Sequence, residues 1–187
     1  MIYYLDKEKI LEEIIGTRKI VLKVLRRKEV YMEEKTNVMR MLDQKKIPYK
    51  AHNYTATGAV SGEEVANALH QDPASVFKTL VTVGKTGTYY VFLVPVLGEL
   101  DLKKGAKASG EKKIEMIKAK ELLPLTGYIH GGCSPIGMKK SFKTFLDSSA
   151  EDQEHIFFSA GRIGDQIEMN PKDLKKIVNY RFADIAE

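Results

Sequence analysis

The stretch SVFKTLVTV, residues 75–83, constrains the fold more than any other part of the sequence. Its β-branched and aromatic residues predict a strand. Because side chains alternate along a strand, Lys78 shares one face with Val76 and Leu80. Both faces are mostly apolar, so the strand is expected inside the fold. A lysine is almost never fully buried unless it is paired, so Lys78 needs a partner.

Periodicity and turn residues predict a mixture of helices and strands along the rest of the chain. The turn at 84–87 predicts a hairpin between this strand and a second apolar strand, TYYVFLVPV. Helices are predicted around 38–46, 62–69, 102–110 and 118–123 and from Pro171, and further strands at 49–54, 142–147, 154–160 and 165–169. The pattern predicts a single α+β domain, with a mixed or antiparallel sheet that curls toward a barrel-like form.

Length and composition indicate one globular domain with a short addition. The chain has 187 residues, of which 43% are hydrophobic and 29% charged. Residues 1–31 differ from the remainder of the chain and are predicted to be an extension, helical or poorly ordered, before a domain over 32–187. The N-terminus does not resemble a secretory signal, and no apolar run approaches the roughly 20 residues that span a bilayer. We expect a cytoplasmic protein with no membrane partner.

The sequence offers little for metal or cofactor chemistry. One cysteine leaves no internal disulfide, and the four histidines lack ligand-type spacing. Cys133 is expected to be a small buried hydrophobic residue rather than a nucleophile. The nucleotide-binding, α/β-hydrolase and zincin motifs are absent. We therefore predict neither a metal nor a cofactor.

Two glycine-bearing loops are candidate ligand sites. In TGYIHGGCSPIG (126–137), the amides of Gly131 and Gly132 can approach a carbonyl oxygen or phosphate, with Ser134 nearby. A tight structural turn is the alternative. In the second loop, Ser159 and Asp165 flank another turn. Asp165 is either the counter-charge of Lys78 or an ordinary turn aspartate.

Five segments in one order resemble the YbaK/EbsC family of free-standing aminoacyl-tRNA deacylases. They are VFKTL (76–80), PVLGELDLKK (95–104), TGYIHGGCSPIGMKK (126–140), FFSAGRIGDQIEM (157–169) and FADIAE at the end. The family is similar to the editing domain of bacterial prolyl-tRNA synthetase, and the resemblance runs from about residue 35 to 187. It implies a mixed α/β domain around a strongly curved sheet. It also implies metal-independent hydrolysis of Cys-tRNA(Pro).

The resemblance assigns a role to each candidate residue. It implies that Lys78 engages the aminoacyl-adenosine end of the substrate and that the substrate's own thiol is the nucleophile. Gly131 and Gly132 would supply amides to the carbonyl oxygen. The implied substrate-binding residues are Tyr54, Ser134, Ser159 and Asp165.

Clustered lysines and a formal net charge of +5 are compatible with a tRNA partner. A solvated helix face remains the alternative. If tRNA binds, Lys103, Lys104, Lys139 and Lys140 are the main candidates for its phosphates, with Lys107, Lys112 and Lys113 beside them. Prolyl-tRNA synthetase is a second candidate partner, which would supply tRNA selection.

The sequence leaves three other functions open. The first is a deacylase for another small amino acid such as alanine. The second is a non-catalytic module that binds tRNA or a synthetase. The third is Schiff-base chemistry at Lys78.

Overall fold

A long antiparallel hairpin forms the centre of the larger sheet, as the sequence predicts. The computed structural model describes residues 35–187, and all the elements below belong to the unit Thr36–Glu187. Strand β2 (Phe77–Gly84) pairs with β3 (Tyr89–Pro95), with Lys78 opposite Val94. The predicted extension over residues 1–31 lies outside the described residues.

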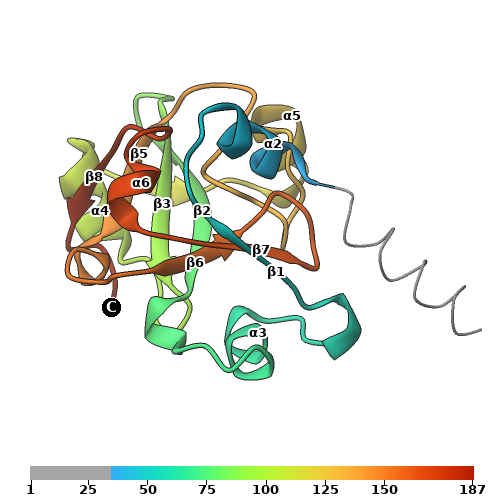
Figure 1. Ribbon diagram of the computed structural model, residues 1–187. Coiled ribbons are helices and arrows are strands. Elements are labelled where there is room, and N and C mark those ends of the chain that lie inside the picture. The colour runs from blue at the N-terminus through green and yellow to red at the C-terminus, as the bar shows by residue number, and fades with distance from the viewer. Residues whose placement is uncertain (1–34) are drawn as a thin grey trace, which may run out of the picture. The chain divides into compact units, whose positions relative to one another are not determined.

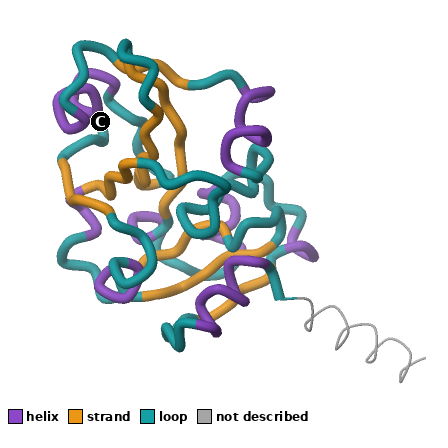
Figure 2. Tube along the Cα trace, turned by 90° about the horizontal axis from the view of Figure 1, so that it is seen from above, coloured by secondary structure: helices purple, strands orange, loops and turns teal. Residues whose placement is uncertain are grey.

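The strands form two sheets (Figures 1 and 2). The five-stranded sheet has the order β4-β2-β3-β5-β8, in which β3, β5 and β8 run parallel and the other pairs are antiparallel. The three-stranded sheet, β1-β7-β6, is antiparallel and runs across one face of the larger sheet (Figure 1). The remaining strands are β1 (Lys50–Asn53), β4 (Ile114–Met116), β5 (Lys143–Asp147), β6 (Ile156–Ser159), β7 (Asp165–Met169) and β8 (Tyr180–Ala183).

Short helices connect the strands, and side-chain caps fix where several begin. Ser61 and Glu64 form the predicted capping box, and Asp101 accepts from two backbone amides of the next helix. The helices are α2 (Asn37–Gln44), α3 (Gly62–Ala68), α4 (Leu102–Ser109), α5 (Ala119–Thr126) and α6 (Pro171–Leu174), with single 3₁₀ turns at Thr55–Thr57, Pro73–Ser75 and Ser148–Ala150.

Strand alternation divides the core between the two faces of the large sheet. Phe77, Val81 and Leu93 pack between the two sheets, against residues such as Ile167. On the other face, Phe92 packs beneath α4. The hairpin is therefore buried on both sides, as its apolar composition requires.

The mixed α/β class is as predicted, whereas several details differ. The strands lie in two sheets, and barrel-like curvature stays a prediction. Strands β4 and β8 were not expected, and the final helix is a single turn because the chain leaves it for β8. Within residues 35–187, no helix is both long and apolar enough to cross a membrane.

Candidate functional site

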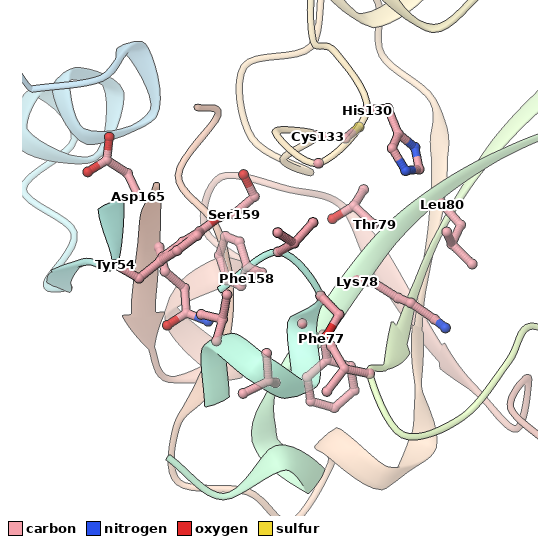
Figure 3. Close-up of a pocket in the computed structure, with 18 of the residues that line it drawn as sticks. Tyr54, Phe77, Lys78, Thr79, Leu80, His130, Cys133, Phe158, Ser159 and Asp165 are labelled. Atoms are coloured by element: carbon pink, nitrogen blue, oxygen red, sulfur yellow. The ribbon is translucent and has the colours of Figure 1, made fainter. Parts of the chain in front are cut away.

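A cavity of about 290 Å³ opens beside the first half of β2 (Figure 3). Strand β4 pairs only with Thr82–Gly84. Phe157 of β6 forms one isolated bridge with Val76, the residue before β2. The edge of β2 between these contacts is open to the cavity. Several segments far apart in the sequence complete its wall, and they contribute Tyr54, Ser61, Gly131, Ser159 and Asp165 among others.

Lys78 lies on the cavity wall and is neither fully buried nor unpaired. Its side chain is 27% exposed, and its Nζ lies 2.8 Å from Oε1 of Glu99. The ammonium points away from the side of the cavity that holds Tyr54 and Ser159 (Figure 3). Because the Glu99 side chain is 77% exposed, the ion pair contributes only about 0–1 kcal/mol. An anionic ligand could therefore replace Glu99 at small cost.

Asp165 is not the counter-charge of Lys78. Its Oδ2 lies 2.5 Å from Nε of Arg162, and its Oδ1 accepts a hydrogen bond of 2.8 Å from Asn53. The residue is 5% exposed and lines the cavity. Of the two alternatives left by the sequence, the turn aspartate is correct. Asp165 stabilises the 160–165 turn and ties it to β1.

The glycine loop has three candidate residues, Gly131, Gly132 and Ser134. Of these, only Gly131 lines the cavity. Gly131 has φ +80°, a left-handed conformation that favours glycine, and it lines the cavity. The N–H of Gly132 donates to the carbonyl of Ile129 at 3.1 Å. Ser134 is fully buried, and its hydroxyl accepts from the Ile136 N–H at 3.4 Å. Neither Gly132 nor Ser134 lines the cavity, so their predicted contacts with substrate gain no support from this geometry.

Tyr54 and Ser159 both line the cavity, and their substrate-binding role stays a prediction. Tyr54 follows β1, where its N–H donates to the Gly164 carbonyl at 2.8 Å. Ser159 ends β6, and its hydroxyl accepts from the Gly161 N–H at 3.2 Å. Residues distant in sequence are thus brought to one wall by the pairing of β1, β7 and β6.

Sequence reasoning missed four polar residues of the cavity wall: Ser61, Thr79, His130 and Gln166. Within the described chain, the Thr79 hydroxyl is buried and has no hydrogen-bond partner. Thr79 and Lys78 are neighbours in β2, so strand alternation puts their side chains on opposite faces of the sheet. The sequence therefore gave no reason to group the two residues. They share the cavity because it wraps around the open edge of β2.

Cys133 also lines the cavity, but burial makes it a poor nucleophile. The residue is 8% exposed, and burial raises the pKa of its thiol to about 12. At neutral pH the thiol is protonated, and the thiolate is the reactive form. This supports the expectation that Cys133 is not catalytic.

The predicted tRNA lysines differ in their surroundings. Lys103 and Lys140 are exposed. Lys104 is tied to Asp184 at 2.8 Å and to the Ala186 carbonyl at 2.8 Å. Lys139 is exposed, and its Nζ is 3.5 Å from the Leu123 carbonyl. Lys104 is therefore the least available of the four for a phosphate.

Residues 35–187 contain no group of three or more side chains arranged to hold a metal ion. The fold is that of an aminoacyl-tRNA editing domain. The model of that family matches residues 57–177, and the chain belongs to this family.

One similar protein has a named substrate. The chain is 48% identical over 154 residues to EbsC of Enterococcus faecalis, which carries a provisional assignment as a Cys-tRNA(Pro)/Cys-tRNA(Cys) deacylase. The match covers 82% of this chain and 94% of EbsC.

Two solved structures have the same fold. One is provisionally described as a trans-editing enzyme for prolyl-tRNA synthetase. It has 27% identity and a TM-score of 0.68, over 74% of this chain and 87% of that one. The other is a hypothetical protein with 20% identity and a TM-score of 0.74, over 81% of this chain and all of that one. The second likeness concerns the fold alone.

Proposed function

We propose that this protein hydrolyses the ester of mischarged tRNA, with Cys-tRNA(Pro) as its substrate. The observation that carries the proposal is a lysine in an apolar strand at the edge of a cavity that is also lined by Tyr54, Gly131 and Ser159. The 48% identity to EbsC supports the choice of substrate. The cavity is at the small end of the range for ligand sites, roughly 300–1,000 Å³, which suits the aminoacyl end of a tRNA.

Lys78 is the proposed anchor of this aminoacyl-adenosine end. Its ammonium exchanges Glu99 for an oxygen of the substrate, which the weak surface pair permits. A cation next to a largely apolar cavity attracts an anionic group more strongly than it would in bulk water. Lys78 thereby fixes the position of the ester beside β2.

The Gly131 amide is the proposed hydrogen-bond donor to the ester carbonyl. It donates to no backbone carbonyl in the described chain, and its loop lines the cavity. A donor fixed in position stabilises the negative charge that develops on the carbonyl oxygen. Gly132 supports this role indirectly, because its bond to Ile129 holds the turn. Tyr54 and Ser159 are proposed to contact the amino acid and the ribose from the opposite wall.

The substrate's own thiol is the proposed nucleophile. Its sulfur bonds to the ester carbonyl carbon, the bond from that carbon to the tRNA oxygen breaks, and the thiol proton ends on the released 3′ hydroxyl. The products are uncharged tRNA and a cyclic thioester, which water opens to cysteine. This step requires no protein nucleophile, which agrees with the raised pKa of Cys133.

Selection of the tRNA is proposed to come partly from a synthetase. The 3′ end that would enter the cavity is the same in every tRNA, so the cavity by itself does not select one tRNA. The similar solved structure described as a trans-editing enzyme for prolyl-tRNA synthetase supports that enzyme as the partner.

Deacylation of Cys-tRNA(Pro) and Ala-tRNA(Pro) by the wild type and by Lys78→Ala tests the proposal. We expect loss of cysteine, slow loss of alanine, and at least about a 100-fold lower kcat/KM in the variant. Lys85→Ala, in the exposed turn of the same hairpin, is the matched control. Circular dichroism checks that each variant is folded.

Other outcomes would favour the alternative functions. Equal cleavage of alanine would make water the nucleophile and argue against thiol assistance. Binding of charged tRNA without any cleavage would make the protein a non-catalytic module.

A further inference from the structure

A second cavity lies away from the aminoacyl cavity, at the β8 edge of the large sheet. It has a volume of about 430 Å³ and is formed by the end of α4 and the chain around β5 and β8. Its polar lining residues are Ser109, Ser141, Lys143, Thr144, Asn179 and Arg181, and none of the lining residues is acidic. No role described above uses this cavity.

Its two cations are available to a ligand. Lys143 and Arg181 are exposed, and neither has an ion-pair partner within 4.0 Å among residues 35–187. Glu111 is a carboxylate that interacts electrostatically with Lys143: its pKa is lowered by hydrogen bonds from Thr86 and Tyr90 and, to a smaller extent, by the charge of Lys143. Glu111 is thus already bound by two hydroxyls, and the Lys143 ammonium makes no hydrogen bond to it.

The remaining lining groups suit a phosphodiester. The Asn179 amide and the Ser141 hydroxyl are exposed beside the cations and can donate to phosphate oxygens. Arg181 can bind phosphate through two N–H groups at once. Phe142 is half-buried in the same wall and offers a surface on which a nucleoside could rest.

The register places this cavity on the same face of the sheet as Lys78. Lys78 and Leu80 share a face, and Leu80 pairs with Phe92, Phe92 with Phe145, and Phe145 with Arg181. Directly paired residues lie on one face of a sheet. Three strand spacings separate β2 from β8, which is roughly 14 Å.

Helix α4 covers the sheet between the two sites. Gly105 faces Phe92, and Lys103 and Lys107 on the same helix are exposed. A polyanion that extends from Lys78 across α4 would therefore meet lysines before it reaches Arg181. Figure 1 shows α4 and β8 close together at one side of the domain.

We propose that this second cavity binds a phosphodiester of the tRNA, as an anchor separate from the cavity that holds the aminoacyl end. The inference rests on the proposed function for the identity of the nucleic acid. It gives a small domain an attachment to the body of the tRNA that the aminoacyl cavity alone cannot supply.

The double variant Lys143→Ala/Arg181→Ala tests the anchor. We expect the Kd for uncharged tRNA and the KM for Cys-tRNA(Pro) to rise roughly tenfold, and the slope of log K against log salt to fall in magnitude by about 1–2. Hydrolysis of cysteinyl-adenosine, which is too short to reach the second cavity, should keep its wild-type rate.

The matched control removes one lysine and one arginine from a different part of the fold. Arg40→Ala/Lys45→Ala changes one exposed arginine and one exposed lysine at α2. Wild-type tRNA affinity and salt slope in Lys143→Ala/Arg181→Ala, or an equal loss in the α2 control, would overturn the proposal. Binding of adenosine monophosphate is measured alongside. If Lys143→Ala/Arg181→Ala loses this binding but keeps its tRNA affinity, the cavity serves a free nucleotide and the proposal is overturned.

Failure of the proposed function would be recognised separately. A wild-type protein that cleaves neither ester refutes the deacylase function. The affinity for uncharged tRNA still decides whether the second cavity binds a phosphodiester.

Discussion

At the scale of single residues, the lysine inside an apolar strand is explained by an open strand edge. The stem of Lys78 lines the cavity, and its ammonium reaches Glu99 at the surface. Its long side chain keeps the charge partly solvated while the backbone stays in the sheet. Desolvation of the ammonium is thereby avoided until a ligand binds.

Glu99→Gln should strengthen substrate binding without a change in the chemical step. The substitution removes the charge that competes with the substrate for Lys78, and a surface ion pair of at most about 1 kcal/mol corresponds to at most about a fivefold lower KM. Steady-state kinetics on Cys-tRNA(Pro) measures this effect. A lower kcat with unchanged KM would instead mean that Glu99 holds Lys78 in its active position.

Cys133→Ala should retain activity within a few-fold of the wild type. The raised thiol pKa of about 12 leaves about one thiol in 10⁴ ionised at pH 8, so Cys133 should also react slowly with iodoacetamide. Mass spectrometry of the alkylated protein and a deacylation assay check both points. Rapid alkylation at pH 8, or a variant that folds but is inactive, would show that the thiol takes part.

At the scale of elements, the lengths of neighbouring strands determine where the cavity lies. Strand β2 is paired with β3 over its whole length, but β4 covers only its last three residues. Strand β6 forms a single bridge with Val76, just before β2, and pairs along its length with β7 instead. The uncovered edge between β4 and β6 is therefore the open side at which ligand groups can approach Lys78.

Asp147→Ala should destabilise the protein by about 1–3 kcal/mol at pH 6. Asp147, at the end of β5, is 5% exposed and accepts hydrogen bonds from the backbone N–H groups of Ser149, Ile185 and Ala186. Without the carboxylate these donors lose their acceptor, two of them in the segment that follows β8. Urea unfolding of the variant measures the loss, and Asp152→Ala, an exposed aspartate, is the control.

The contribution of Asp147 should disappear in acid. Burial alone would raise its pKa, but the hydrogen bonds outweigh burial and lower the pKa below the ordinary value of 3.8. A carboxyl with a lowered pKa stabilises the folded state above the unfolded pKa and loses that effect as pH falls through the folded value. The difference in unfolding free energy between wild type and Asp147→Ala should therefore shrink between pH 6 and pH 2. A constant difference would contradict this account.

At the scale of the whole molecule, the site depends on two sheets that share a core. The candidate residues come from both sheets and from the loops between them. Ile167 on β7 is fully buried between the sheets with Val81 and Leu93 of the hairpin. Loosening this contact should weaken both the fold and the alignment of Ser159 with Lys78.

Ile167→Ala should cost about 2–5 kcal/mol of unfolding free energy, because it leaves a cavity in a closely packed core. Leu97→Ala removes a side chain from a residue that is 59% exposed and should change stability by less than about 0.5 kcal/mol. Chemical denaturation compares the two variants. Similar stabilities would mean that the two sheets do not form one cooperative core.

Local patterns predicted the elements that depend on neighbouring residues. The hairpin, the Ser61–Glu64 capping box and the helix capped by Asp101 were confirmed. Strands β4 and β8 were missed because they are short and are formed by pairing with strands distant in sequence. The final helix was predicted too long because its lysines and apolar residues fit a helix, whereas β8 requires the chain to turn away.

The candidate site also combines features that follow from the local sequence with features that only the tertiary structure determines. By itself, the sequence determined that an apolar hairpin carries a lysine that needs a partner, and that two glycine-bearing loops have the backbone freedom of candidate ligand sites, because these features depend on local composition. The tertiary structure decided that Glu99 is that partner, that Asp165 binds Arg162, and that Gly131 rather than Gly132 reaches the cavity. Those outcomes depend on distances between segments far apart in the chain, which only the packing of the two sheets determines.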